Sequence, residues 1–156
     1  MKQLKQFIAE KLHISNYKGY NYHPETKKEL AELINKLIKE RGNEANLNDI
    51  DTSKIIDMSY LFSTDDYKLE NFDGDISEWD VSNVKFFTSM FRDSEFSGKN
   101  GDLSNWKFDN AENMNFMFKN SKFKGNISDW KLGKVDKFFM FDNCPLEKNP
   151  PKWYHD

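Results

Sequence analysis

The stretch FDGDISEWDVSNVKFFTSMF, residues 72–91, decides the fold because similar sequences recur twice further along the chain. FSGKNGDLSNWKFDNAENMNFMF follows at residues 96–118, and FKGNISDWKLGKVDKFFMF at residues 123–141. Each copy has a glycine near its start, a tryptophan in its middle and a Met-Phe pair at its end. Self-similarity at a period of about 20–50 residues indicates an architecture of stacked units.

The copies align on their tryptophans, Trp79, Trp106 and Trp130, which lie 27 and 24 residues apart. Apolar residues recur at fixed offsets around them, so we expect the tryptophans to be core residues. The offset eight residues after the tryptophan holds Phe87, Met114 and Phe138, and the third copy is one residue shorter before its Met-Phe pair. A degenerate first copy fits upstream, with Leu47, Ile50, Thr52, Ile55, Met58, Leu61 and Phe62 at the same offsets.

Within one unit the pattern predicts a short strand followed by a short helix. Trp79 and Val81 have strand spacing, and Ser82-Asn83 is typical of a helix N-cap. Val84, Phe87, Met90 and Phe91 then follow at i, i+3, i+6 and i+7, which is one helical stripe. The sequence therefore predicts an α/β repeat, a short leucine-rich-repeat-like solenoid of about four strand–helix units with an N-terminal helical cap.

The recurring pattern FxGxISxWDVSNVxxxxxMF resembles the BspA-like leucine-rich-repeat proteins. This bacterial surface-protein repeat is also known as a domain of unknown function of mycoplasma lipoproteins. The resemblance covers about residues 47–145, and the tryptophan, the Ser-Asn and the Met-Phe pair recur in it together. It implies a curved solenoid with a binding role and no catalytic residues.

We expect three regions: a helical cap at residues 1–46, the repeats at 47–145 and a capping tail at 146–156. The first region contains HPETKKELAELINKLIKERG, in which Pro24 suits the first helical position and Gly42 the end. Its apolar stripe consists of Leu30, Leu33, Ile34, Leu37 and Ile38. Such a helix before the first repeat is expected to cover the open end of the solenoid.

Composition indicates a protein that folds without disulfides or metals. The 156 residues include 24 aromatic side chains, 14 Phe, 6 Tyr and 4 Trp, which bury large areas. Cys144 is the one cysteine, as in proteins of a reducing compartment. The N-terminus has no apolar signal region, and no apolar run reaches the length of a membrane span. We therefore expect a cytoplasmic protein without membrane contact.

No catalytic or metal-binding motif is present in the sequence. The three histidines, His13, His23 and His155, fit no metal-ligand spacing, and no nucleophile or phosphate-binding motif occurs. We expect a protein that is not an enzyme, with no cofactor, no metal and no catalytic residue.

The charge is uneven along the chain. Residues 1–46 carry net +3 and residues 47–156 net −6. An acidic body does not suit nucleic acid, so RNA or DNA could be contacted only through the basic head.

Two sets of residues are candidates for partner binding. Asp49, Glu78, Asn105 and Asp129 precede the tryptophan position, and Asp51, Asp80, Lys107 and Lys131 follow it. These residues form either an acidic strip that meets a basic protein surface or an ordinary solvated edge. The second set, Tyr17, Lys18, Tyr20 and Tyr22, forms either an aromatic-basic contact site or a loop that packs on the body.

These observations favour a non-catalytic protein–protein interaction module whose partner has a basic surface. A small bacterial or phage-encoded inhibitor of a host enzyme, for example a defence nuclease of the CRISPR type, would fit this description. Phage origin would place it in the host cytoplasm. The alternatives are an adhesion module from an exported repeat protein and an RNA- or DNA-contacting protein that uses the basic head.

Overall fold

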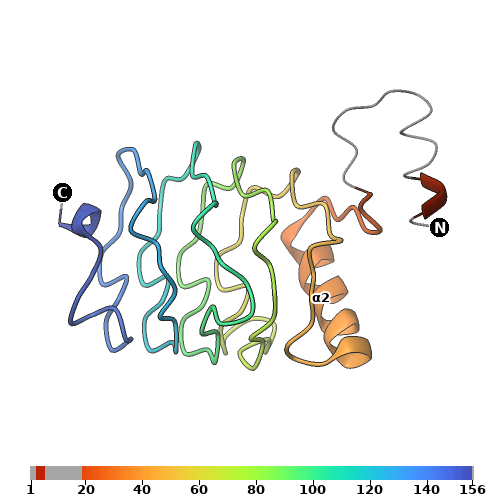
Figure 1. Cartoon of the computed structure of the whole chain (residues 1–156), viewed down its shortest axis with the longest axis horizontal. Coiled ribbons are helices and arrows are strands. Elements are labelled where there is room, and N and C mark those ends of the chain that lie inside the picture. The colour runs from red at the N-terminus through yellow and green to blue at the C-terminus, as the bar shows by residue number, and fades with distance from the viewer. Residues whose placement is uncertain (1–2, 6–18, 156) are drawn as a thin grey trace.

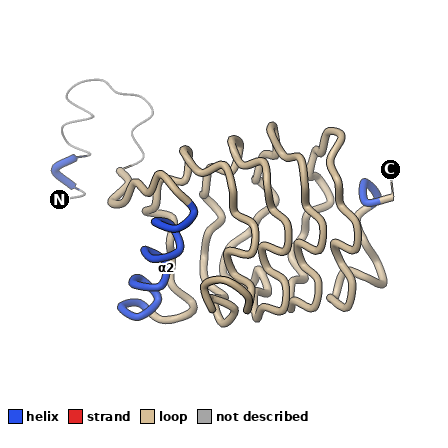
Figure 2. Tube along the Cα trace, turned by 180° about the vertical axis from the view of Figure 1, so that it is seen from behind, coloured by secondary structure: helices blue, strands red, loops and turns tan. Residues whose placement is uncertain are grey.

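The computed structural model describes residues 3–5 and 19–155, and it forms a row of coils that lie side by side (Figure 1). The helix α2 (Lys27–Arg41) lies at the N-terminal end of the row, and the 3-10 helix η1 (Lys152–Tyr154) lies at the other end. Everything between them is turns and loops, as the tan tube of Figure 2 shows.

The predicted strand–helix unit is wrong. Among the described residues, the repeats contain neither a helix nor a named strand, and no sheet forms. Neighbouring coils are joined instead by isolated parallel bridges, which link Asp57 to Phe86, Phe86 to Asn113 and Asn113 to Asp136. The leucine-rich-repeat-like solenoid expected from the sequence is therefore replaced by a stack of irregular coils that keep one register.

Hydrogen bonding explains why no helix forms in the second half of each unit. The backbone N–H of Phe87 donates to the carbonyl of Asn113 at 2.8 Å, and that of Ser89 to Asn115 at 2.9 Å, both in the next coil. Met90, the residue after Ser89, donates back to the carbonyl of Phe87 at 3.1 Å. A helix would need every N–H to reach the residue four before it. Ser89 also has φ 54°, which reverses the helical handedness.

Side-chain turns take the place of the predicted helix cap. Oδ1 of Asp80 accepts from the backbone N–H of Ser82 at 3.0 Å and from its hydroxyl at 2.6 Å. The side-chain amide of Asn83 donates to the carbonyl of Ser53 in the preceding coil at 2.8 Å. Ser82 and Asn83 therefore form a tight Asp-x-Ser turn and a link between coils, because short polar side chains compete with helical hydrogen bonds.

Two ladders of phenylalanine rings run through the core. The first consists of Phe62, Phe91, Phe118 and Phe141, and the second of Phe72, Phe96 and Phe123. Successive centroids within the first ladder are 5.3, 5.4 and 6.0 Å apart. The two ladders touch at 4.2 to 4.8 Å. Because stacked rings bury large apolar areas, these ladders supply much of the packing between coils.

The tryptophans form a third column, and their predicted burial is confirmed. Trp79, Trp106 and Trp130 are only 3–4% exposed. Each indole N–H donates to a carbonyl of the preceding coil, that of Leu47 at 3.0 Å, Ile76 at 3.2 Å and Leu103 at 2.8 Å. A buried indole needs such an acceptor, and the recurring backbone supplies one in each coil.

The last repeat differs in register from the sequence alignment. Because the N–H of Met114 donates to the carbonyl of Asp136 at 2.6 Å, Lys137 stands in the column expected for Phe138. Trp130 still occupies the tryptophan column and Asp136 is bridged to Asn113, so the missing residue of this copy is lost between Trp130 and Asp136. Phe138 moves out of the expected core position and is 62% exposed.

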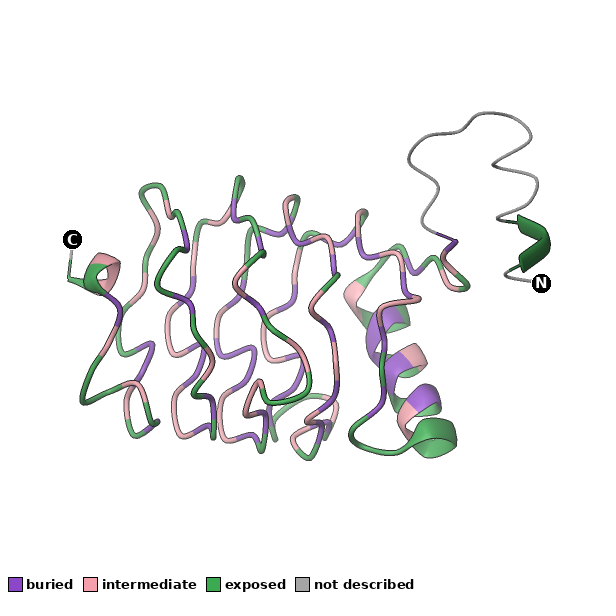
Figure 3. Cartoon of the chain, viewed as in Figure 1, coloured by how far each residue is buried: buried purple, intermediate pink, exposed green. Residues whose placement is uncertain are grey.

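Helix α2 closes the N-terminal end. Its residues Leu30, Ala31, Ile34 and Leu37 are buried and join the same core as the coils, as the purple stretches of α2 in Figure 3 indicate. Thr26 is the N-cap and accepts from Glu29, so the helix begins after Pro24 rather than at it. Gly42 ends the helix as expected, at φ 86°.

The C-terminal end is covered by the tail. Pro151 is buried, and η1 lays the Trp153 ring on that of Trp130 with centroids 5.9 Å apart. Tyr154 packs against Phe141 at 4.9 Å. These contacts agree with a tail that folds over the last repeat.

Candidate functional site

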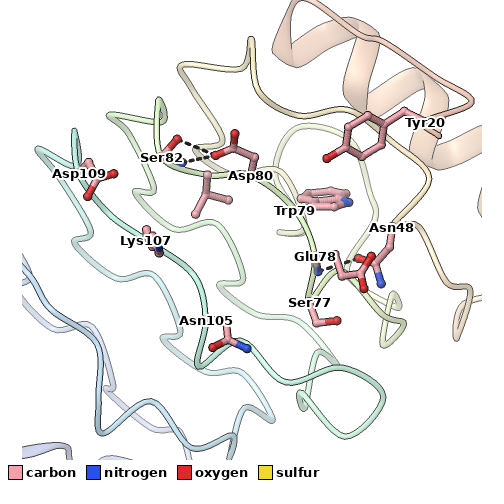
Figure 4. A pocket seen from close by; sticks show the side chains of 11 residues that line it. Tyr20, Asn48, Ser77, Glu78, Trp79, Asp80, Ser82, Asn105, Lys107 and Asp109 are labelled. Carbon is pink, nitrogen blue, oxygen red and sulfur yellow. Dashed lines mark hydrogen bonds between the residues drawn. The ribbon is translucent and has the colours of Figure 1, made fainter. Parts of the chain in front are cut away.

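A groove lies between the second and third coils, beside Trp79 (Figure 4). Its volume is about 780 Å³, and its polar lining includes Tyr20, Glu78, Asp80, Asn105, Lys107 and Asp109. We call this feature the Glu78 groove. Five of the predicted partner-binding residues meet there, and Tyr20 comes from the segment that the sequence placed in a separate aromatic site.

Local turns hold the groove in shape. The backbone N–H of Glu78 donates to Oδ1 of Asn48 at 2.9 Å, which ties the groove to the first coil. Trp79 forms part of the wall and is almost fully buried. Oδ1 of Asp80 is occupied by the turn at Ser82. The side chains that remain for a ligand are therefore presented from a fixed backbone.

The groove carries more negative than positive charge. Its carboxylates are Glu78, Asp80 and Asp109, and its one amine is Lys107. Glu78, Asp109 and Lys107 are exposed, and within the described part of the chain none of them forms an ion pair. Such an arrangement attracts a cationic group and leaves the Glu78 and Asp109 carboxylates able to receive it.

Asp49 is placed differently from the rest of the predicted strip. Its side chain is 13% exposed, and both oxygens contact the Arg41 guanidinium at 3.0 and 3.1 Å. Asn21 adds a hydrogen bond at 2.9 Å. Burial alone would raise the pKa of Asp49, but the bonds from Arg41 and Asn21 outweigh it and hold the pKa below its usual value. Asp49 thus fastens α2 to the first coil.

Asp51 is engaged as well. Its Oδ1 accepts from the backbone N–H of Ser53 at 3.0 Å, and its Oδ2 lies 3.3 Å from Nδ1 of His23. Burial opposes ionisation of this carboxyl, yet the hydrogen bonds from Ser53 and His23 lower its pKa overall.

The remaining predicted residues are spread out. Asp129 lines a separate cavity of about 590 Å³ next to the tail, and Lys131 is exposed. Tyr22 pairs with Ile50 through a parallel bridge and packs on the core, as the loop-packing alternative expected. Tyr17 and Lys18 lie outside the described residues. The structure therefore brings together only the central part of the predicted strip.

Sequence reasoning missed Asp109 and Asn48. Asp109 lies three residues after Trp106, two positions beyond Lys107, where the comparison of the charged strip ended. Asn48 precedes Asp49 in the first copy, and its role became visible only when the second coil lay beside it. The roles of Asp109 and Asn48 depend on how neighbouring coils stack, and the sequence of a single repeat does not contain that information.

The described residues show neither a cluster of metal ligands nor a helix that could cross a membrane. In the part of the chain that the structure describes, no three His, Cys, Asp or Glu side chains are grouped as they would need to be for a metal ion. No helix among the described residues has the length and apolar character that a bilayer crossing requires. Neither a curated protein nor a solved structure gives a significant match. Residues 29–153 match one family, and the chain therefore belongs to the family described as "Mycoplasma protein of unknown function, DUF285".

Proposed function

We propose that this protein is a non-catalytic protein-binding module whose Glu78 groove receives a basic side chain of its partner. The observation that carries the proposal is the pair of exposed carboxylates, Glu78 and Asp109, that have no ion pair among the described residues. Arginine is the side chain that suits carboxylates of this kind, because its planar guanidinium can bind two oxygens at once.

Charge on the rest of the molecule supports the same partner. Residues 47–156 carry net −6, so a basic protein would be attracted before contact and its association would be faster. The resemblance of the repeats to BspA-like proteins, which implies a binding role, is consistent with this function. An acidic groove repels phosphates, so it does not favour nucleic acid as the ligand.

A defined probe tests the groove directly. We would measure fluorescence anisotropy of a labelled oligo-arginine peptide with the wild-type chain and with Glu78→Gln/Asp109→Asn. These changes remove two charges and keep the side-chain shapes, and Asp80 stays because it holds the Ser82 turn. The wild type should bind more tightly, and its affinity should fall as the salt rises from about 50 to 300 mM.

Asp66→Asn/Glu147→Gln is the matched control, because both residues are exposed acids outside the groove. It changes the net charge by the same amount and should bind like the wild type. Equal affinity of the wild type and the groove variant would refute the proposal. Capture from a bacterial lysate with the same three proteins would then identify partners whose retention needs the groove charges.

A further inference from the structure

Exposed apolar side chains lie at or within three residues of the bridges that join the coils, and we call this bridged side of the stack the edge. Apart from Leu4, the large apolar residues that are exposed in the described chain are Ile56, Phe86, Phe138 and Phe139. Ile56 and Phe86 lie in contact on this edge, since the N–H groups of Lys85 and Phe86 both reach the carbonyl of Ile56. Phe138 and Phe139 are the adjacent pair, 62% and 55% exposed, so the C-terminal part of the edge is the most apolar.

Phe138 and Phe139 form one surface with Phe116, which we call the aromatic patch. The rings of Phe116 and Phe139 stack with centroids 5.6 Å apart and planes within 7°. The backbone N–H of Phe116 donates to the carbonyl of Phe138 at 3.0 Å, and the N–H of Phe138 donates to the side chain of Asn115 at 2.6 Å. The patch is therefore held in place before any partner arrives, which lowers the ordering cost of binding.

The fold itself does not explain why aromatic residues stand here. Phe116 and Phe139 have φ angles of 59° and 53°, in the left-handed region that favours glycine and asparagine. Each of these coils has a second left-handed position four residues later, and asparagine stands there, as Asn120 and Asn143. Phe139 combines an unfavourable backbone with a ring that stays 55% exposed despite its stack on Phe116, which is typical of a residue that contacts a partner.

Charges around the patch are balanced. Lys119 lies 5.5 Å from the centre of the Phe116 ring and 3.5 Å from Oδ2 of Asp142. Asp136 and Lys137 directly precede the patch in sequence. A partner of one charge sign would meet repulsion as well as attraction at this rim. A surface with the same apolar centre and the same mixture of charges fits it better, because each cation can face an anion.

We infer that two copies of the chain associate through the aromatic patch as a symmetric dimer. A twofold contact places the same patch on both sides, so apolar rings meet apolar rings and the two rims complement each other. Both ends of the stack are covered, by α2 and by the tail, so the side is the surface left for self-association. Three aromatic side chains make a small interface, and the dimer should form in a concentration-dependent way.

Sedimentation velocity tests the inference at protein concentrations from roughly 1 to 500 µM, a range that brackets a weak interface. The wild type should shift from monomer to dimer as the concentration rises. Phe138→Asn/Phe139→Asn should stay monomeric throughout. Asparagine stands at the first of these positions in the preceding coil, as Asn115, and it suits the left-handed backbone of the second, so the variant should fold normally.

Ile56→Thr is the control, because it removes an exposed apolar side chain from the other end of the same edge and should dimerise like the wild type. A wild type that remains monomeric at every concentration would overturn the inference and leave the patch to a different protein. Equal dimerisation of the wild type and the double variant would overturn it as well. Binding of the oligo-arginine peptide should be the same in all three proteins, since the patch shares no residue with the Glu78 groove.

Discussion

The indole N–H of Trp153 donates to the carbonyl oxygen of Ile127 at 2.8 Å, and this bond repeats the one between Trp130 and Leu103 in the coil before. The tail therefore supplies the tryptophan of a fifth coil without supplying the rest of it. A single side chain continues the column and satisfies a carbonyl that the last coil would otherwise leave without its indole donor.

Replacing Trp153 should loosen the C-terminal end. Trp153→Phe removes the hydrogen bond to Ile127 and should cost about 1 kcal/mol of the free energy of unfolding. Trp153→Ala also removes the half-buried ring and should cost about 2–3 kcal/mol, less than a fully buried aromatic. Urea unfolding followed by circular dichroism gives both values. Two variants with wild-type midpoints would mean that the tail does not contribute to stability.

Trp106 lies in the middle of the tryptophan column, so replacing it should destabilise the fold more than replacing Trp153 does. The ring is 4% exposed and lies 6.3 Å from that of Phe108. Trp106→Ala should lower the free energy of unfolding by about 3–5 kcal/mol, because a cavity opens between two coils. The test is a thermal melt against the wild type. A midpoint within a degree or two of wild type would contradict the packing of this column.

The contact of α2 with the first coil can be tested with one buried and one exposed residue of the helix. Ile34 is fully buried, so Ile34→Ala should cost about 2–5 kcal/mol. Lys36 is exposed on the other side of the helix, and Lys36→Ala should stay within about 0.5 kcal/mol of wild type. Chemical denaturation of both variants measures the difference. Similar small effects would show that α2 does not share the core of the coils.

Substitution by lysine should destabilise the fold at Asp49 and leave its stability almost unchanged at Glu78. Asp49→Lys places a cation against Arg41 and should lower the free energy of unfolding by about 2 kcal/mol or more. Glu78 is exposed, so Glu78→Lys should leave stability within about 0.5 kcal/mol. Melting temperatures of the two variants decide the point. Equal stability of the two variants would mean that the Asp49–Arg41 ion pair does not stabilise the fold.

The ion pair between Asp49 and Arg41 predicts that the stability of the fold depends on pH. The pKa of Asp49 is lowered in the folded chain, so its carboxylate stabilises the fold above the unfolded value of about 3.9. This contribution should disappear as the pH falls through the lower folded value. Arg41→Met removes the cation that lowers this pKa, so the variant should be less stable than the wild type at neutral pH and should lose less stability as the pH falls. Urea midpoints measured between about pH 3 and 7 test this, and parallel profiles would contradict it.

The sequence predicted the columns well and the backbone poorly. The tryptophan spacing and the Met-Phe pairs mark buried positions, and Trp79, Met90 and Phe91 are indeed buried. The spacing i, i+3, i+6, i+7 was interpreted as a helix, but a coil with a left-handed residue at Ser89 also brings these side chains to one side. Apolar spacing records which residues are inside, and it does not record where their N–H groups donate.

The candidate site was predictable only in part for a related reason. Glu78, Asn105 and Lys107 were found because they flank the tryptophan position, which the coils preserve. Arg41 was not expected beside Asp49, because that pair depends on how α2 sits on the first coil. The sequence shows that the last copy is one residue shorter, but only the hydrogen bonds to the preceding coil show that the residue is lost before Asp136.

The bridges between coils also bear on how the chain folds. They join residues about one repeat apart, as Asp57 with Phe86 and Asn113 with Asp136 do. A molecule of this kind can nucleate at whichever pair of neighbouring coils closes first and then zip outward, one coil at a time. During synthesis, α2 and the first coils could already be assembled while Trp153 is still inside the ribosome.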